Sequence, residues 1–210
     1  WVVADILTGD INKKKVDFSR IDAASLKEWA DFCDEIPTGL TDDAYKFPRY
    51  ESNFVLDYDA TVMEAIQQVS TSAKATLNII DGKYGVLIDK YKDVPVQIFT
   101  PRNYKNFSSQ RVYARQPQAL DVSYVDPSRD WTVTTLTVYD NGYNSGNLTE
   151  EADEITAFGC TNSEQAWREG RYKMAQNRLR QEVITLDVDF EYLVCSRGDF
   201  VQITQDAMLA

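Results

Sequence analysis

Residues Glu154 to Thr204 have the most informative local pattern of the chain and read EITAFGCTNSEQAWREGRYKMAQNRLRQEVITLDVDFEYLVCSRGDFVQIT. Thr161-Asn-Ser-Glu164 has the spacing of a capping box, which predicts that a helix begins there and runs to about Gln181. The alternation of apolar and polar side chains from Val183 to Phe190 predicts a half-buried strand. Ser196-Arg-Gly-Asp199 predicts a turn into a last short strand. The stretch is a scaffold and contains no catalytic device.

One residue in the middle of this predicted helix is unfavourable by itself. Gly170 costs about 1 kcal/mol relative to alanine at an interior helical position. Close approach of another backbone would explain a glycine at this place, so we predict that the helix packs tightly on its sheet at Gly170. The apolar or small positions of the helix are Ala166, Gly170, Tyr172, Met174, Ala175 and Leu179.

Composition excludes several classes of function. The 210 residues carry a formal net charge of -11, which argues against a nucleic-acid partner because phosphate binding depends on Lys and Arg. The chain has no histidine, so histidine-dependent triads and most zinc sites are excluded, and no cofactor is predicted. No apolar run approaches the roughly 18 residues of a membrane helix. The chain begins with Trp1 rather than Met, which suggests a piece of a longer polypeptide.

The three cysteines do not form a recognisable framework. Their number is odd and no pair has CxxC spacing, which favours buried thiols in a reducing cytosol over a disulfide framework. They are Cys33, Cys160 and Cys195.

Residues 1–50 are predicted to dock one helix onto the body of the protein. Asp22 is the expected N-cap of a helix that extends to about Glu35 and places Leu26 and Trp29 on one apolar face. Residues 1–8 form a short apolar stretch that is compatible with helix or strand. The lysines at 13–15 belong to a polar loop, and residues 38–50 are also predicted to be loop.

Residues 51–94 have the pattern of a small strand-helix-strand-strand module. Strands are predicted at 54–56, 76–80 and 84–88. Asp81-Gly82 is a hairpin signal, because a primed turn needs positive φ. Asp59 is the expected cap of the intervening helix. The buried stripe of this helix is expected to contain Val62, Ile66, Val69 and Ala73.

Residues 95–210 are predicted to form a β-rich, barrel-like hub domain that carries the long helix 162–181. An edge strand or linker is expected at 96–99, because prolines flank it. Strands follow at 120–125 and 131–139, and Asp126-Pro127 turns the chain between them. The predicted fold class is therefore α+β.

Two acidic segments resemble functional sites only superficially. Asp140 and Glu151 occupy the first and twelfth positions of a calcium-loop pattern, but Gly142 and Ser145 break it at the third and sixth. This segment is therefore predicted to be a hairpin loop. The neighbouring acidic residues are expected to be solvated, and they are Glu150, Glu151, Asp153 and Glu154. We accordingly predict no catalytic residue and no metal ligand.

The predicted helix concentrates basic residues in an otherwise acidic chain. They either form a solvated face paired with Glu164 and Glu169, or they contact another subunit. Both interpretations remain open from the residues alone. The candidates for such an interface are Trp167, Arg168, Arg171 and Arg178.

As a set, these residues resemble the tail tip attachment protein J family of lambda-like siphophages. The similarity rests on Ile155-Thr-Ala-Phe-Gly-Cys-Thr161, then Gln165-Ala166, Gly170-Arg171 and Arg178, followed by a strand and Gly198-Asp199. Upstream segments fit the same pattern, and they are Val122-Ser-Tyr-Val-Asp-Pro127, Asp5-Ile-Leu-Thr8, and Ser19 to Leu26 with Ala30 and Cys33-Asp34. One departure is the loop from Gly9 to Lys15, where family members often carry a Tyr-Gly-x-Gly-like loop.

The resemblance implies a structural role rather than an enzymatic one. It implies a central tail hub that joins the tail tube to the tip and to host-recognition parts, usually as a ring of three subunits. Its partners would be other copies of itself and the tail tube and tail tip proteins. It would lie in the virion tail tip, and in the host cytoplasm during assembly. The alternatives are a cell-wall glycan hydrolase and a carbohydrate- or receptor-binding module.

Overall fold

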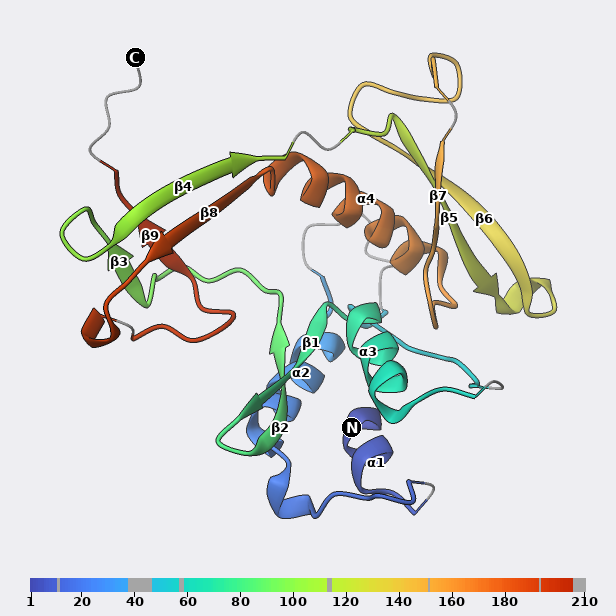
Figure 1. Cartoon of the computed structure of the whole chain (residues 1–210). Coiled ribbons are helices and arrows are strands. Elements are labelled where there is room, and N and C mark those ends of the chain that lie inside the picture. The colour runs from blue at the N-terminus through green and yellow to red at the C-terminus, as the bar shows by residue number, and fades with distance from the viewer. Residues whose placement is uncertain are drawn as a thin grey trace. The chain divides into compact units, whose positions relative to one another are not determined.

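The computed structural model describes residues 1–10, 12–37, 47–56, 59–112, 115–150, 152–192 and 194–205. Within these ranges the fold is mixed α+β and contains four small sheets (Figure 1). None of these sheets closes into a barrel, so the predicted barrel-like hub is wrong in this respect. The chain divides into two compact units, which are Trp1–Ile88 with Pro117–Met174, and Asp89–Gln116 with Ala175–Ala210.

The first unit begins with short helices. The apolar stretch 1–8 adopts helix α1 (Val2–Thr8), and η1 (Phe18–Arg20) follows. Helix α2 (Ala23–Asp34) begins as predicted after Asp22, whose carboxylate accepts hydrogen bonds from the amides of Ala24 and Ser25. The predicted loop 38–50 lies mostly outside the described residues.

Helix α3 (Val62–Ser72) begins two residues later than the predicted Asp59 cap allows. Its N-cap is Thr61, which forms a capping box with Glu64, because this pair satisfies orphan amides that Asp59 is too distant to reach. Ile66 and Val69 are buried as predicted, whereas Val62 is exposed. Residues 54–56 contain no strand, which corrects the prediction there, and the Phe54 ring instead packs beside Phe158 with centroids 5.1 Å apart.

The predicted hairpin is confirmed. Strands β1 (Ala75–Ile80) and β2 (Lys83–Ile88) pair antiparallel. Asp81 and Gly82 both have positive φ, as a primed turn requires. The sheet and helices α1 to α3 enclose one hydrophobic core, in which the most deeply buried side chains are Val3, Leu26 and Ile66.

A second core of the same unit lies against a three-stranded sheet. Its order is β6 (Thr132–Tyr139), β5 (Ala119–Asp126) and β7 (Asp153–Thr156), with β5 antiparallel to β6 and parallel to β7. The predicted turn after β5 contains η2 (Pro127–Arg129). The core side chains include Leu120, Val122, Tyr124, Val138, Ala166 and Met174.

Helix α4 (Ser163–Leu179) lies inside the range predicted for the long helix. Its first turn is capped by Asn162, whose side-chain oxygen accepts from the Glu164 amide at 2.9 Å. The predicted capping box at Thr161 is therefore wrong, because the Thr161 hydroxyl instead accepts a hydrogen bond from the side-chain Nδ2 of Asn53. The helix is also not part of a barrel: its residues through Met174 belong to the first unit and the rest to the second.

Gly170 lies where α4 presses on the sheet, as predicted. A Cβ atom on Gly170 would lie 2.9 Å from Val138 Cγ2 and 3.1 Å from Val122 Cγ2. Both distances are shorter than ordinary carbon contacts of about 3.5–4.0 Å. The missing side chain therefore sets how closely the helix axis approaches strands β5 and β6.

The second unit contains two separate two-stranded sheets. Strand β3 (Gln97–Phe99) pairs parallel with β9 (Val201–Ile203), and β4 (Lys105–Arg111) pairs antiparallel with β8 (Glu182–Asp187). The predicted turn at Ser196–Asp199 leads into β9, and η3 (Phe190–Tyr192) precedes it. Strand β8 is mostly exposed rather than half-buried, and β4 was not predicted because its sequence is almost entirely polar.

The predicted division into 1–50, 51–94 and 95–210 concerns segments of sequence rather than contact units, and it stays a prediction.

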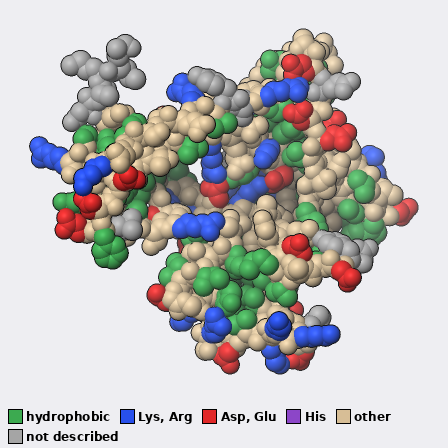
Figure 2. All heavy atoms as spheres, viewed as in Figure 1, with side chains coloured by type: hydrophobic (Ala, Val, Ile, Leu, Met, Phe, Trp, Pro, Cys, Tyr) green, Lys and Arg blue, Asp and Glu red, His purple; other side chains and the backbone are tan. Residues whose placement is uncertain are grey.

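Acidic and basic side chains are interspersed over the visible face of the molecule, with groups of hydrophobic side chains among them (Figure 2). Among the described residues, no helix has the length and apolarity needed to cross a membrane.

Replacing Gly170 tests the packing of α4. Gly170→Leu should lower the free energy of unfolding by about 1–3 kcal/mol or more, because the new side chain overlaps Val138 and Val122. Thermal and urea unfolding would measure the change. Lys173→Leu is the matched control, because Lys173 is exposed on the same helix and should tolerate leucine. If Gly170→Leu unfolds like the unmodified chain, the close-packing interpretation is wrong.

Candidate functional site

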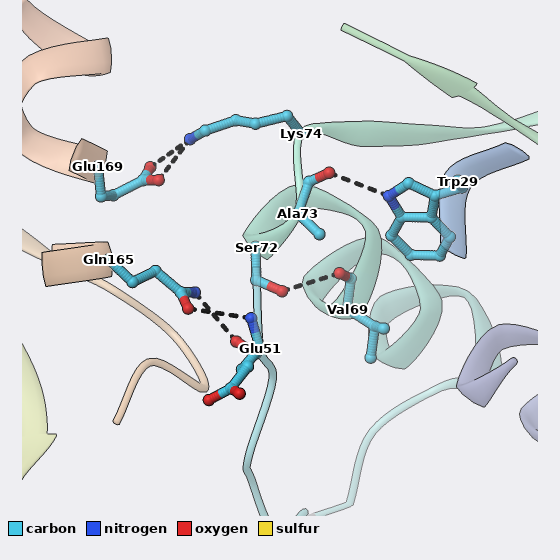
Figure 3. A network of polar contacts seen from close by, with 8 residues as sticks. All are labelled: Trp29, Glu51, Val69, Ser72, Ala73, Lys74, Gln165 and Glu169. Carbon is cyan, nitrogen blue, oxygen red and sulfur yellow. Dashed lines mark hydrogen bonds and ion pairs between the residues drawn. The ribbon is translucent and has the colours of Figure 1, made fainter. Parts of the chain in front are cut away.

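In the first unit, two residues of α4, Gln165 and Glu169, bond to Glu51 and Lys74 (Figure 3). We call these four residues the polar seam. Gln165 is only 5% exposed, although it is polar. Its side-chain oxygen accepts from the Glu51 amide, and its side-chain nitrogen donates to the Glu51 carbonyl, each at 3.0 Å. The carboxamide therefore binds the backbone of Glu51 as a strand partner would, and satisfies both of its own polar atoms.

A buried ion pair continues the seam. The Lys74 ammonium donates to Glu169 Oε1 at 2.6 Å and lies 4.1 Å from the centroid of the Tyr172 ring. The Lys74 side chain is 7% exposed and that of Glu169 is 25% exposed. Water therefore screens this pair much less than an exposed one.

Lys74 also has an unusual backbone. Its φ is 55°, in the left-handed region, directly after the C-cap residue Ala73 of α3. Glycine is the usual residue there, and a side chain at such a φ costs about 1–2 kcal/mol. The ion pair with Glu169 gives a physical reason for a lysine at this position.

The four candidate interface residues lie in different surroundings. Trp167 is 41% exposed. Arg171 is held inside the unit, because its guanidinium donates to the Tyr139 carbonyl and to Asn141 Oδ1, each at 2.8 Å. Arg168 is half-buried and lies 5.9 Å from the Tyr50 ring centroid, whereas Arg178 is exposed.

A cavity of about 340 Å³ lies beside this seam. Helix α3, the segment Thr156–Cys160 and the first half of α4 line it. Glu64 forms part of the α3 wall, and the hydrogen bonds from the Thr61 amide and hydroxyl lower the pKa of its carboxyl. Cys160 is buried in the opposite wall, and this burial raises the pKa of its thiol, which keeps the sulfur neutral.

The three cysteines and the acidic residues near β7 are the other groups whose chemical state the sequence predicted. All three cysteines are free thiols, of which Cys160 is fully buried while Cys33 and Cys195 are half-buried. Burial raises the pKa of Cys33 to about 11. Asp153 and Glu154 are exposed at the start of β7, and Glu151 lies outside the described residues. Within the described chain, no group of three acidic or cysteine residues has metal-binding geometry.

The contacts of the seam were not predicted from the sequence. Gln165 was named only for the family resemblance, Glu169 was expected on a solvated face, and Lys74 was not singled out. The available signal was the spacing of Gln165 and Glu169, which are four residues apart and therefore share a helix face. Their partners, Glu51 and Lys74, are about a hundred residues away in the sequence, so no local pattern connects them.

The fold is similar to that of a known tail protein. The crystal structure of the tail protein from Neisseria meningitidis MC58 superposes with a TM-score of 0.53 and 15% sequence identity, over 73% of this chain and 48% of that one. A family model described as "Putative phage tail protein" matches residues 89–209. The chain belongs to this phage tail protein family.

Two curated phage proteins are similar to this chain. Tip attachment protein J of Escherichia phage SECphi27 is 25% identical over 98% of the chain. Baseplate hub protein pb3 of Escherichia phage T5 is 24% identical over 43% of the chain. The chain spans 17% and 10% of the lengths of these two relatives, respectively.

The ion pair of the seam can be tested by a double-mutant cycle. Lys74→Met, Glu169→Gln and the double variant should give a coupling free energy of about 0.5–3 kcal/mol in urea unfolding, because the ammonium is buried. The matched control is the exposed pair Lys27 and Asp31 on α2, whose coupling should be about 0.3–0.5 kcal/mol. Equal coupling in the two cycles would contradict the importance of the buried pair.

The capping box of α3 predicts a pH dependence. The pKa of Glu64 is lowered in the folded chain, so its stabilising effect is present above the unfolded pKa and is lost as the pH falls through the folded pKa. The difference in Tm between the unmodified chain and Glu64→Gln should therefore shrink between about pH 7 and about pH 3. Circular dichroism melts would measure it. A difference that is constant over this range would show that the carboxylate form does not stabilise the cap.

Proposed function

We propose that this chain is a structural hub domain of a bacteriophage or prophage tail tip, which joins the tail tube to the tip and to host-recognition parts. The observation that carries the proposal is the likeness to Tip attachment protein J along 98% of the chain. The likeness to a baseplate hub protein and the membership of a phage tail family support it. Since the chain spans 17% of the relative named J, this role is proposed for one segment of a longer protein.

The proposed role is assembly rather than catalysis. The two relatives are named for attachment and for a baseplate hub. The two carboxylates that line the cavity are both engaged, Glu64 by the cap of α3 and Glu169 by Lys74. A glycosidase needs one carboxyl group to transfer a proton and another to act as nucleophile or base. We therefore do not propose the glycan hydrolase alternative.

The proposed partners are two further copies of the same protein and the neighbouring tail tube and tail tip proteins. A closed ring of three copies requires each copy to use two different surfaces, because its contacts are head-to-tail. We propose that α4 contributes to one of them. Trp167 and Arg178 offer exposed side chains. Arg171 is bonded to the Tyr139 carbonyl, and Arg168 is half-buried near the Tyr50 ring, so both are directed into the unit.

The remaining parts of the proposal concern place and ligands. The protein would be made in the host cytoplasm and would function in the virion tail tip, with no cofactor and no nucleic-acid partner. The acidic net charge of -11 supports a basic protein surface as a neighbour rather than phosphates.

The interface proposal is tested in the full-length tail protein that contains this chain. Trp167→Ala and Arg178→Glu should reduce the yield of complete tails, because large aromatic and arginine side chains contribute most to interface free energy. Complementation of a phage that lacks the gene, with tails counted by electron microscopy, would measure the yield. Lys14→Glu is the matched control for charge reversal, because Lys14 is exposed in a loop far from α4 in sequence.

Two results would contradict this proposal. Tails at normal yield in both variants would exclude α4 as a subunit contact. Full-length protein that remains monomeric in light scattering and is absent from purified virions would contradict the hub role itself.

A further inference from the structure

The cavity beside α3 lies within the first unit and has the size of a small-ligand site. Its volume of about 340 Å³ is at the lower end of the range of roughly 300–1,000 Å³ typical of such sites. From α4, Gln165 points towards Glu51 and Glu169 points towards Lys74 (Figure 3). Gln165 and Glu169 also line the cavity, so the part of its wall that α4 contributes is held by interactions within the unit.

Helix α3 presents its polar face to this cavity. Its apolar stripe, which includes Ile66 and Val69, is buried in the first core. The residues that line the cavity follow the helical spacing of three and four on the other side, and they are Glu64, Gln67, Gln68 and Thr71. Most of these side chains are also exposed to solvent, so a ligand could reach them from outside while the second wall lies opposite.

The charges of the cavity argue for a neutral ligand. Among the described residues that line it there is no lysine or arginine, so an anion would find no opposite charge. The carboxylate of Glu169 is already bound by Lys74, and that of Glu64 accepts from Thr61. A cationic ligand would have to compete with both interactions.

Three polar side chains at the cavity remain available. Gln67, Thr71 and Thr156 are exposed, and within the described chain their carboxamide and hydroxyl groups make no hydrogen bond to protein. Carboxamides and hydroxyls each both donate and accept hydrogen bonds. The hydroxyl groups of a sugar do the same, so these side chains match a polyhydroxylated ligand.

The opposite wall is partly apolar. Ala157 and Phe158 line it, and the Phe158 ring is held against Phe54 with centroids 5.1 Å apart. A pyranose ring has apolar C–H groups on its faces and hydroxyls at its edge. One apolar wall opposite a row of carboxamide and hydroxyl groups therefore fits such a ring.

We propose that this cavity binds one neutral hexose unit, with Gln67 and Thr71 of α3 and Thr156 bonding its hydroxyls and Phe158 contacting its ring. The site binds the sugar without cleaving it, because both carboxylates at the cavity are held in other interactions. This inference is independent of the hub role, since a hub domain can be correct with or without a sugar site.

The test uses the 210-residue chain and named sugars. Saturation-transfer NMR with methyl α-D-glucopyranoside, methyl α-D-galactopyranoside and N-acetyl-D-glucosamine should show saturable, millimolar binding of at least one of them. Gln67→Leu and Thr71→Val should each weaken that binding about tenfold, because each removes one hydrogen-bonding group. A trisaccharide that ends in the bound sugar distinguishes the sources: tighter binding than the monosaccharide indicates a glycan chain, and equal binding indicates a free sugar.

Matched variants separate the cavity from the rest of the surface. Gln110→Leu and Thr76→Val make the same chemical changes at exposed positions of β4 and β1, and they should leave sugar binding unchanged. Circular dichroism melts would establish that all four variants fold. Absence of saturable binding by every sugar would overturn the proposal. Binding that survives in both Gln67→Leu and Thr71→Val, or that the control variants weaken equally, would also overturn it.

Discussion

The contact between the backbone of Gly170 and the valines of the sheet is the constraint on which the first unit depends. Because Gly170 has no side chain, α4 approaches Val138 and Val122 more closely than a Cβ would allow. Ala166 and Met174, four residues to either side, are buried in the same core. This stripe fixes the depth and the rotation of the helix. The rotation then determines which other residues of α4 face the N-terminal segments.

Gln165 and Glu169 share the neighbouring face of α4, and their bonds to Glu51 and Lys74 connect the two hydrophobic cores of the unit. Such a polar connection is directional, whereas apolar packing is not. It requires that each buried polar atom find its partner, and the carboxamide of Gln165 satisfies both of its atoms on one residue. The left-handed backbone of Lys74 is consistent with this requirement, because a glycine there could not supply the ammonium.

Helix α4 therefore has one face packed within the first unit, whereas other side chains of the same helix are exposed. Trp167 and Arg178 lie on the outer part of that helix, whereas Arg171 is engaged within the unit. The sequence placed all four candidates on one helix and could not separate them, because helical spacing does not show which carbonyl or ring lies opposite a guanidinium. The cavity is likewise invisible in the sequence, since its walls come from residues 64–72 and 156–169.

Features that arise from local interactions were predictable from the residues alone. They are the cap at Asp22, the hairpin turn at Asp81-Gly82, the strands around Val122 and Val138, and the close packing at Gly170. The N-caps of α3 and α4 were predicted at the wrong residues, because Thr61 and Asn162 each have a neighbour of similar capping chemistry. Long-range pairing settled the rest: within the described ranges the sheets are open and do not close into a barrel, and the polar strand β4 pairs with β8. These outcomes depend on hydrogen bonds between segments distant in sequence, for which composition and periodicity carry no signal.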